Sequence, residues 1–116
     1  MSGIRIAVLA VLASLLVAGP AAARPATASS TTVTVKMKEF KFILSRGTVP
    51  HGKVIFKLVN IGHLAHDFKI GTHKSALIQP GKTGKLAVTL SAGKHAYKCT
   101  VAGHAASGMK GVLKVT

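Results

Sequence analysis

Apolar and polar side chains alternate along much of the chain beyond residue 30. In residues 33–37 every second side chain is apolar, and the two between them are threonine and lysine. A period of two places the apolar side chains on one face of a β-strand, because successive side chains of a strand point to opposite faces. The phase changes between Lys38 and Phe40, so we expect a bulge or a bend there.

Five further segments have the length and composition of strands. They span residues 53–59, 66–70, 85–90, 93–99 and 110–115. Turn-forming residues divide the chain at Pro50-His51-Gly52, Pro80-Gly81 and Ala92-Gly93. No stretch shows a convincing helical period. Several short strands without helices between them predict an all-β fold, an antiparallel β-sandwich.

Charged residues indicate which face of each strand points outward. Lys98 marks the outward face beside Cys99, and Asp67 does so beside His66. By the same rule Met109 points inward. The alternation therefore predicts that an imidazole, a thiol and a thioether share the core-facing phase.

The first 23 residues are typical of a secretory signal peptide. Arg5 gives a positive start, residues 6–18 are almost entirely apolar, and three consecutive alanines supply a cleavage site. The apolar run is too short to span a bilayer comfortably, so we expect no membrane span in the mature form. Residues 24–32 predict a flexible leader and residues 33–116 a single domain. The protein is therefore expected to be exported, to a periplasm or to the outside of the cell.

The chain is strongly basic. Lysine and arginine total 16, whereas the acids are Glu39 and Asp67 alone, so the formal net charge is +14 at pH 7. Such a charge favours anionic partners and makes association sensitive to salt. Nucleic acid is not the expected partner, since the chain has four Phe, one Tyr, no recognised motif and an export signal. A cationic interaction domain without a metal remains an alternative, on the charge alone.

Cys99 is the only cysteine of the chain. It cannot form an internal disulfide, and an exposed thiol in an oxidising compartment is open to oxidation, so we expect it to be buried or bound to a metal. Four residues separate Cys99 from His104, and four separate His104 from Met109. Gly103 and Gly108 directly precede His104 and Met109 and allow sharp turns. The segment predicts a loop that brings three donor side chains to one point.

Thiolate, imidazole and thioether together favour copper. Zinc sites take cysteine, histidine and carboxylate, and calcium requires oxygen ligands. Two imidazoles and one thiolate with a weak axial thioether form the blue-copper electron-transfer site. The segment from Cys99 to Met109 lacks only a second histidine for this ligand set.

Residues 97–115, together with the upstream His66-Asp67-Phe68, resemble the cupredoxin family, which includes plastocyanin, azurin and amicyanin. The likeness covers residues 33–115, and its specific part is the Cys-His-Met loop. The resemblance implies a Greek-key sandwich, a single type 1 copper ion and one-electron transfer rather than enzymatic catalysis. By position in the family pattern, the metal ligands would be His66, Cys99, His104 and Met109.

His63 is the alternative to His66 as the upstream imidazole, because it lies three residues earlier in the chain. His66 is favoured since it opens a predicted strand, whereas His63 follows Gly62 in a predicted loop. Family members often have an asparagine after the first histidine and a hydroxyl residue after the cysteine, which link the two loops. The corresponding residues here are Asp67 and Thr100, and Asp67 can accept a hydrogen bond from the Thr100 hydroxyl.

The resulting hypothesis is a soluble, monomeric, exported carrier of single electrons that cycles between Cu(II) and Cu(I). We expect its partners to be redox proteins with acidic docking surfaces. His104 is the expected exit for the electron, because Ala102, Ala105 and Ala106 beside it are small and apolar. The alternative is a copper carrier that delivers the metal. A hydrolytic Cys-His pair is disfavoured, because the chain has only two acids that could orient the base.

Overall fold

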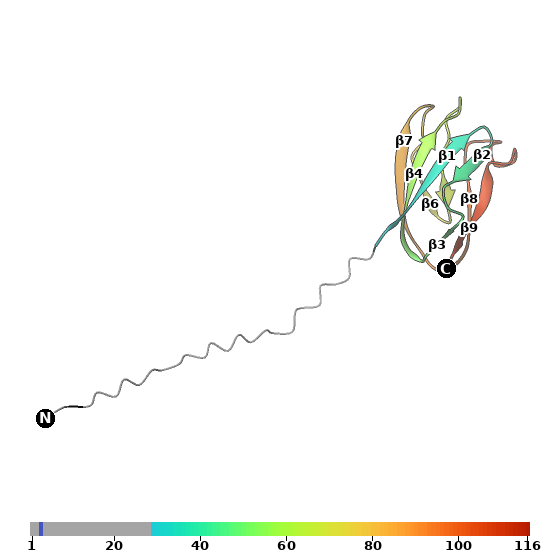
Figure 1. Ribbon diagram of the computed structural model, residues 1–116. Coiled ribbons are helices and arrows are strands. Elements are labelled where there is room, and N and C mark those ends of the chain that lie inside the picture. The colour runs from blue at the N-terminus through green and yellow to red at the C-terminus, as the bar shows by residue number, and fades with distance from the viewer. Residues whose placement is uncertain (1–2, 4–28) are drawn as a thin grey trace.

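The computed structural model describes residue 3 and residues 29–116 of the chain (Figure 1). This part contains nine β-strands and no helix. The strands are β1 (Thr31–Lys38), β2 (Lys41–Leu44), β3 (Thr48–Val49), β4 (Gly52–Asn60), β5 (Lys69–Ile70), β6 (His73–Lys74), β7 (Thr83–Leu90), β8 (Gly93–Lys98) and β9 (Lys110–Val115). No membrane-crossing helix occurs among the described residues.

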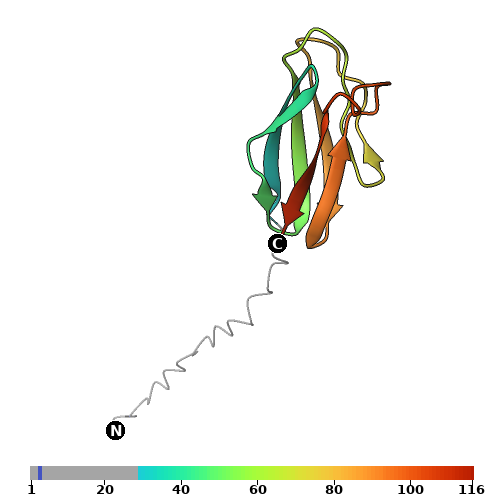
Figure 2. The ribbon, with the colours of Figure 1, turned by 90° about the vertical axis from the view of Figure 1, so that its right-hand side faces the viewer.

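The strands form two sheets that face one another across a common core (Figure 1 and Figure 2). One sheet has the order β2-β1-β4-β7 and the other the order β3-β9-β8-β5-β6. Most neighbouring strands are antiparallel, as expected, whereas β1 with β4 and β3 with β9 run parallel. The pair β1 and β4 can be parallel because the chain crosses to the other sheet at β3 before β4 returns. The all-β sandwich predicted from the alternation is confirmed.

Alternating apolar side chains of both sheets form the core. In β4, Val54, Phe56 and Leu58 are buried, while Lys53 and Lys57 are exposed. The second sheet and its adjoining loop contribute Phe68, Ile70, Leu113 and Val115. Burying one large apolar side chain stabilises a fold by about 1.5–3 kcal/mol. The alternation therefore decides which face of each strand is buried.

The change of phase near Lys38 is a hairpin rather than a bulge or bend within one strand. Lys38 pairs with Lys41, so Glu39 and Phe40 form the turn between β1 and β2. The chain reverses here because two residues are enough to connect antiparallel strands. The turn brings Glu39 to the loop before β5, where its carboxylate accepts a hydrogen bond from the N–H of Leu64.

Other boundaries differ from the predicted ones where strands are short. Only Lys69–Ile70 of the strand expected at residues 66–70 pairs regularly, and His66 forms an isolated bridge with Ile78. The alternation does not predict β3 and β6, because two residues cannot display a period.

The signal peptide expected at residues 1–23 lies outside the described residues, apart from Gly3, and so do residues 24–28 of the expected leader. The first strand begins at Thr31, two residues before the expected domain boundary.

Candidate metal centre

Three side chains with metal-binding atoms meet at the end of the sheet where β5 starts and β8 ends. His66 precedes β5, Cys99 directly follows β8, and His104 lies in the loop between β8 and β9. Their ligand atoms all lie within 4.8 Å of one another, and all three residues are buried. Residues distant in sequence meet here because β5 and β8 are neighbours in one sheet.

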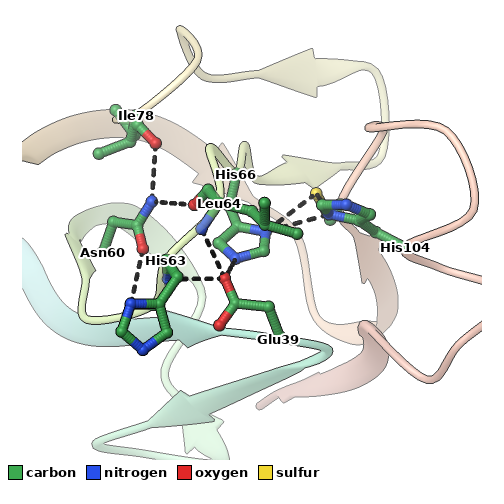
Figure 3. A network of polar contacts seen from close by, with 9 residues as sticks. Glu39, Asn60, His63, Leu64, His66, Ile78 and His104 are labelled. Atoms are coloured by element: carbon green, nitrogen blue, oxygen red, sulfur yellow. Dashed lines mark hydrogen bonds and ion pairs between the residues drawn. The ribbon is translucent and has the colours of Figure 1, made fainter. Parts of the chain in front are cut away.

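The three atoms converge with the spacing of ligands around a single ion. Nδ1 of His66 lies 3.1 Å from Nδ1 of His104, and Sγ of Cys99 lies 3.6 Å from the latter and 4.0 Å from the former (Figure 3). Imidazole nitrogens bind a metal at about 2.0 Å and thiolate sulfur at about 2.3 Å, which places three ligands in one plane about 3.5–3.7 Å apart. The donor set therefore fits one metal ion.

Backbone hydrogen bonds shape the loop that carries Cys99, His104 and Met109. The N–H of Cys99 donates to the carbonyl of Met109 at 3.1 Å, and the N–H of Met109 donates to the carbonyl of His104 at 3.0 Å. Gly103 and Gly108 have φ values of 82° and 114°, which residues with a side chain rarely adopt. The two glycines thus allow the turns that the sequence predicts.

Met109 adjoins the group through these backbone hydrogen bonds. Its side chain is fully buried, with an exposed fraction of 0%. A thioether is a soft, weak donor that suits copper as an axial ligand. Met109 therefore stays the predicted axial ligand, on its position in the loop.

The structure brings His66, and not His63, to the group. His66 is fully buried, whereas His63 is exposed and its main-chain N–H donates to Glu39 at 2.8 Å. The burial of Phe68 and Ile70 agrees with the phase that favours His66 in the sequence.

Glu39 is a further residue of the site, and the sequence pattern does not reveal it. Its Oε1 accepts hydrogen bonds from the N–H of Leu64 at 2.7 Å, the N–H of His63 at 2.8 Å and Nε2 of His66 at 3.1 Å (Figure 3). The hydrogen bond from Leu64 is the main cause that lowers the pKa of Glu39 from 4.5 to about 2, and desolvation opposes this shift in part. Glu39 is therefore charged at neutral pH. The available signals in the sequence are the scarcity of acids and the change of strand phase at this position.

The Glu39 carboxylate determines how the His66 ring faces the group. With Nε2–H donating to Glu39, Nδ1 carries the lone pair and faces Cys99 and His104. A carboxylate in this place holds the tautomer and orientation of a metal-binding histidine and raises its basicity. The ring is thus oriented for a metal on its Nδ1 side.

Asn60, at the end of β4, holds the loop that leads to His66 (Figure 3). Its Nδ2 donates to the carbonyls of Leu64 and Ile78, each at 2.8 Å, and its Oδ1 accepts from the N–H of Gly62 at 2.9 Å. A carboxamide can serve as donor and acceptor at once. One buried side chain therefore fixes two points of the loop and links it to the segment of Ile78 before β7, a role that the strand pattern does not reveal.

Asp67 is buried, contrary to the outward position that the alternation predicts. Its exposed fraction is 2%. Oδ1 accepts a hydrogen bond from the N–H of Thr100 at 2.6 Å, Oδ2 accepts one from the Thr100 hydroxyl, and Nζ of Lys74 lies 3.7 Å from Oδ2. The alternation fails because residue 67 precedes β5 and lies outside a regular strand. The predicted link between Asp67 and Thr100 is confirmed, and it joins the His66 segment to the Cys99 segment.

A hydrolytic site does not fit the same residues. A chain of contacts runs from Cys99 through His66 to Glu39, in the order of a nucleophile, a base and an acid that positions the base. However, Cys99 is only 1% exposed, and burial raises the pKa of its thiol. A substrate cannot reach the sulfur, and the nucleophilic thiolate is disfavoured. Metal binding is the chemistry that suits this buried group.

His104 is the most accessible member of the group, with an exposed fraction of 7%. Phe40 packs edge-on against its ring, with the centroids 5.1 Å apart. Ala102 and Ala106 in the same loop are exposed. An aromatic side chain therefore packs against the His104 ring, and exposed alanines lie in the same loop.

A comparison with models of known protein families gives one match, which covers most of the chain. A family model described as a cupredoxin-like domain matches residues 6–115. No curated protein matches the chain.

Several solved structures share the fold. The dithionite-reduced auracyanin of the photosynthetic bacterium Roseiflexus castenholzii has a TM-score of 0.65 and 21% identity, with 76% of this chain and 98% of that one covered. Auracyanin A of Chloroflexus aurantiacus, described as a "blue" copper protein, has a TM-score of 0.64 and 20% identity, with 76% and 100% covered. The copper nitrite reductase of Nitrosomonas europaea has a TM-score of 0.60 and 21% identity, with 75% and 41% covered. These likenesses confirm the Greek-key sandwich.

Proposed function

The chain belongs to the cupredoxin-like domain family, and on this basis we propose that it is a blue copper protein that carries single electrons. One observation carries the proposal: Nδ1 of His66, Sγ of Cys99 and Nδ1 of His104 converge in a buried site. The proposed ligands of one type 1 copper ion are His66, Cys99, His104 and Met109.

Copper bound there would supply the reversible change between Cu(II) and Cu(I) that moves one electron. The role of the protein would be to hold the donor atoms in place. Glu39 and Asn60 fix the loop of His66, and Asp67 fixes Thr100 beside Cys99. The donors then need little movement when the charge in the site changes.

Burial of the donors supports a carrier rather than an enzyme. A catalytic metal keeps an open position for substrate or water. The exposed fractions here are 0% for His66 and Met109, 1% for Cys99 and 7% for His104. We propose that the electron leaves through His104, which requires contact with a partner but no substrate pocket.

We also propose that the protein is exported, acts as a monomer and exchanges electrons with redox proteins that present acidic surfaces. The signal-like residues 1–23 support export. The net charge of +14, or +13 once a signal peptide with Arg5 is removed, supports acidic partners, because opposite charge speeds encounter.

Copper loading followed by stepwise reduction tests this function. Protein that has taken up one Cu(II) should accept one electron per copper and reoxidise without losing the metal. His66→Gln should abolish the cycle, whereas His63→Gln, at an exposed histidine outside the group, should leave it unchanged.

Delivery of copper predicts a different result in the same experiment. A carrier of the metal would release copper to a Cu(I) chelator as soon as it is reduced. Rapid release without a stable reduced form would contradict the electron carrier. Retention of copper through repeated cycles would support it.

A further inference from the structure

Four lysines stand in one row across the five-stranded sheet. Each pairs directly with the next through the strand register of β6, β5, β8 and β9. In this order they are Lys74, Lys69, Lys98 and Lys110. Directly paired residues point to the same face of a sheet, so the four ammonium groups share one side.

Such a row is unfavourable for the fold itself. Like charges directly opposite one another destabilise a sheet. The chain has only two acids: Asp67 lies 3.7 Å from Nζ of Lys74, and Glu39 is bonded within the candidate metal centre. The other three lysines of the row have no acidic partner among the described residues. Folding therefore does not explain why the positive charges are placed together.

The four-stranded sheet shows that composition alone does not produce such a row. Its outward Lys36 stands between the uncharged Ile43 and Val59. Paired lysines occur there only in twos, as with Lys57 and Lys85. The unbroken row is thus a property of one face.

The row borders an open groove of about 840 Å³ that is lined by residues of β5, β8 and β9. The strands β8 and β9 face the viewer in Figure 2. Ala96 and Val112 pair with each other in the centre of the groove, and Val112 is 58% exposed. Lys94 pairs with Lys114 on the other side of this apolar centre. A groove with basic ends and an apolar centre fits an extended acidic segment of a protein. It fits a planar bilayer surface less well.

We propose that this lysine face docks an acidic segment of the partner that exchanges electrons with the protein. The lysine face consists of Lys69, Lys74, Lys94, Lys98, Lys110 and Lys114. Lys98 directly precedes Cys99, and Lys110 directly follows Met109, so a docked segment adjoins two proposed ligands. That the partner is a redox protein rests on the proposed function, whereas binding of an acidic segment does not.

The lysine face is tested by measuring how tightly two triple variants of equal net charge bind a labelled glutamate-alanine peptide. One triple variant replaces Lys69, Lys98 and Lys110 by glutamine, and the other replaces Lys36, Lys57 and Lys85 on the opposite sheet. The first variant should bind the peptide about tenfold more weakly than the parent, whereas the affinity of the second should stay within about twofold of the parent. Three lysines are replaced together because a single exposed ion pair contributes little to binding. Added salt should weaken the binding of the parent.

Equal weakening by both triple variants would overturn the proposal, because net charge alone would then explain binding. Binding to phosphatidylglycerol vesicles without binding to the peptide would also overturn it, in favour of a membrane. Circular dichroism of both variants would check that they are folded. The copper-free protein serves equally well for this test, so a failure of the copper site leaves the docking result interpretable.

Discussion

Glu39 and His66 are joined by a carboxylate-imidazole hydrogen bond of 3.1 Å. Glu39 comes from the turn between β1 and β2, and His66 from the loop before β5. On the other side of the ring, Nδ1 of His66 lies 4.0 Å from Sγ of Cys99. The imidazole is therefore oriented toward the sulfur by the fold itself.

Replacing Glu39 separates the effect of its charge from that of its hydrogen bond. Glu39→Gln keeps an acceptor for Nε2 of His66 but removes a negative charge, so the copper reduction potential should rise. Glu39→Ala also removes the acceptor and should weaken copper binding by about 10–100-fold, as for other residues that orient a metal-binding histidine. Redox titration and competition with a chelator measure the two effects.

Lys41→Gln is the matched control, because it changes one charge at the other end of the same turn without touching His66. It should leave copper affinity unchanged. Unchanged affinity and potential in Glu39→Ala would show that this carboxylate does not orient the ring.

The low pKa of Glu39 predicts how acid affects the metal-free protein. The pKa is about 2 in the folded chain, against an ordinary value of 4.5. Because folding lowers this pKa, the stabilising contribution is complete above about pH 5 and is lost as the pH falls from there toward 2. Urea unfolding at about pH 6 and about pH 3 should therefore show a larger loss of stability in the parent than in Glu39→Gln. Equal losses would contradict the lowered pKa.

Asp67→Ala should destabilise the protein, because the N–H and the hydroxyl of Thr100 both lose their acceptor. An unsatisfied buried group costs about 1–3 kcal/mol, and Thr100 is half-buried, so we expect a loss of about 1–2 kcal/mol in the free energy of unfolding. Asp67→Asn keeps an acceptor for the N–H and should lose clearly less. Chemical denaturation of the metal-free variants measures both, and equal losses would show that charge, rather than the link between the loops, matters.

Gly111 leaves space for the ring of Tyr97. A Cβ at Gly111 would overlap the Tyr97 hydroxyl and lie 2.5 Å from Cζ. Tyr97 also contacts the rings of Phe42 and Phe68, so it cannot retreat freely. Gly111→Ala should therefore reduce the free energy of unfolding by about 1–3 kcal/mol. Gly47→Ala, whose Cβ would meet nothing within 4 Å, should have little effect, and equal behaviour of the two variants would contradict this packing.

Strand alternation is sufficient to predict the sandwich and the burial of three of the four proposed ligands. Burial of one face repeats every two residues, so His66, Cys99 and Met109 share the phase of the core. The spacing of Cys99, His104 and Met109, with a glycine before each of the last two, is sufficient to predict the loop.

The alternation of apolar and polar residues cannot predict contacts between segments that are distant in the sequence. Glu39 reaches His66 only because a two-residue turn ends β1, and a turn of this length leaves no periodic signal. Asp67 is buried against Thr100 because the chain before β5 is irregular. Resemblance to a family, rather than alternation, predicts that second contact.

The visible absorption spectrum of the protein loaded with Cu(II) tests most directly the claim that Cys99 binds copper as a thiolate. We expect an intense thiolate-to-copper band that is retained in His63→Gln and absent from Cys99→Ser. A colourless copper-loaded protein, or a band that persists in Cys99→Ser, would contradict the account.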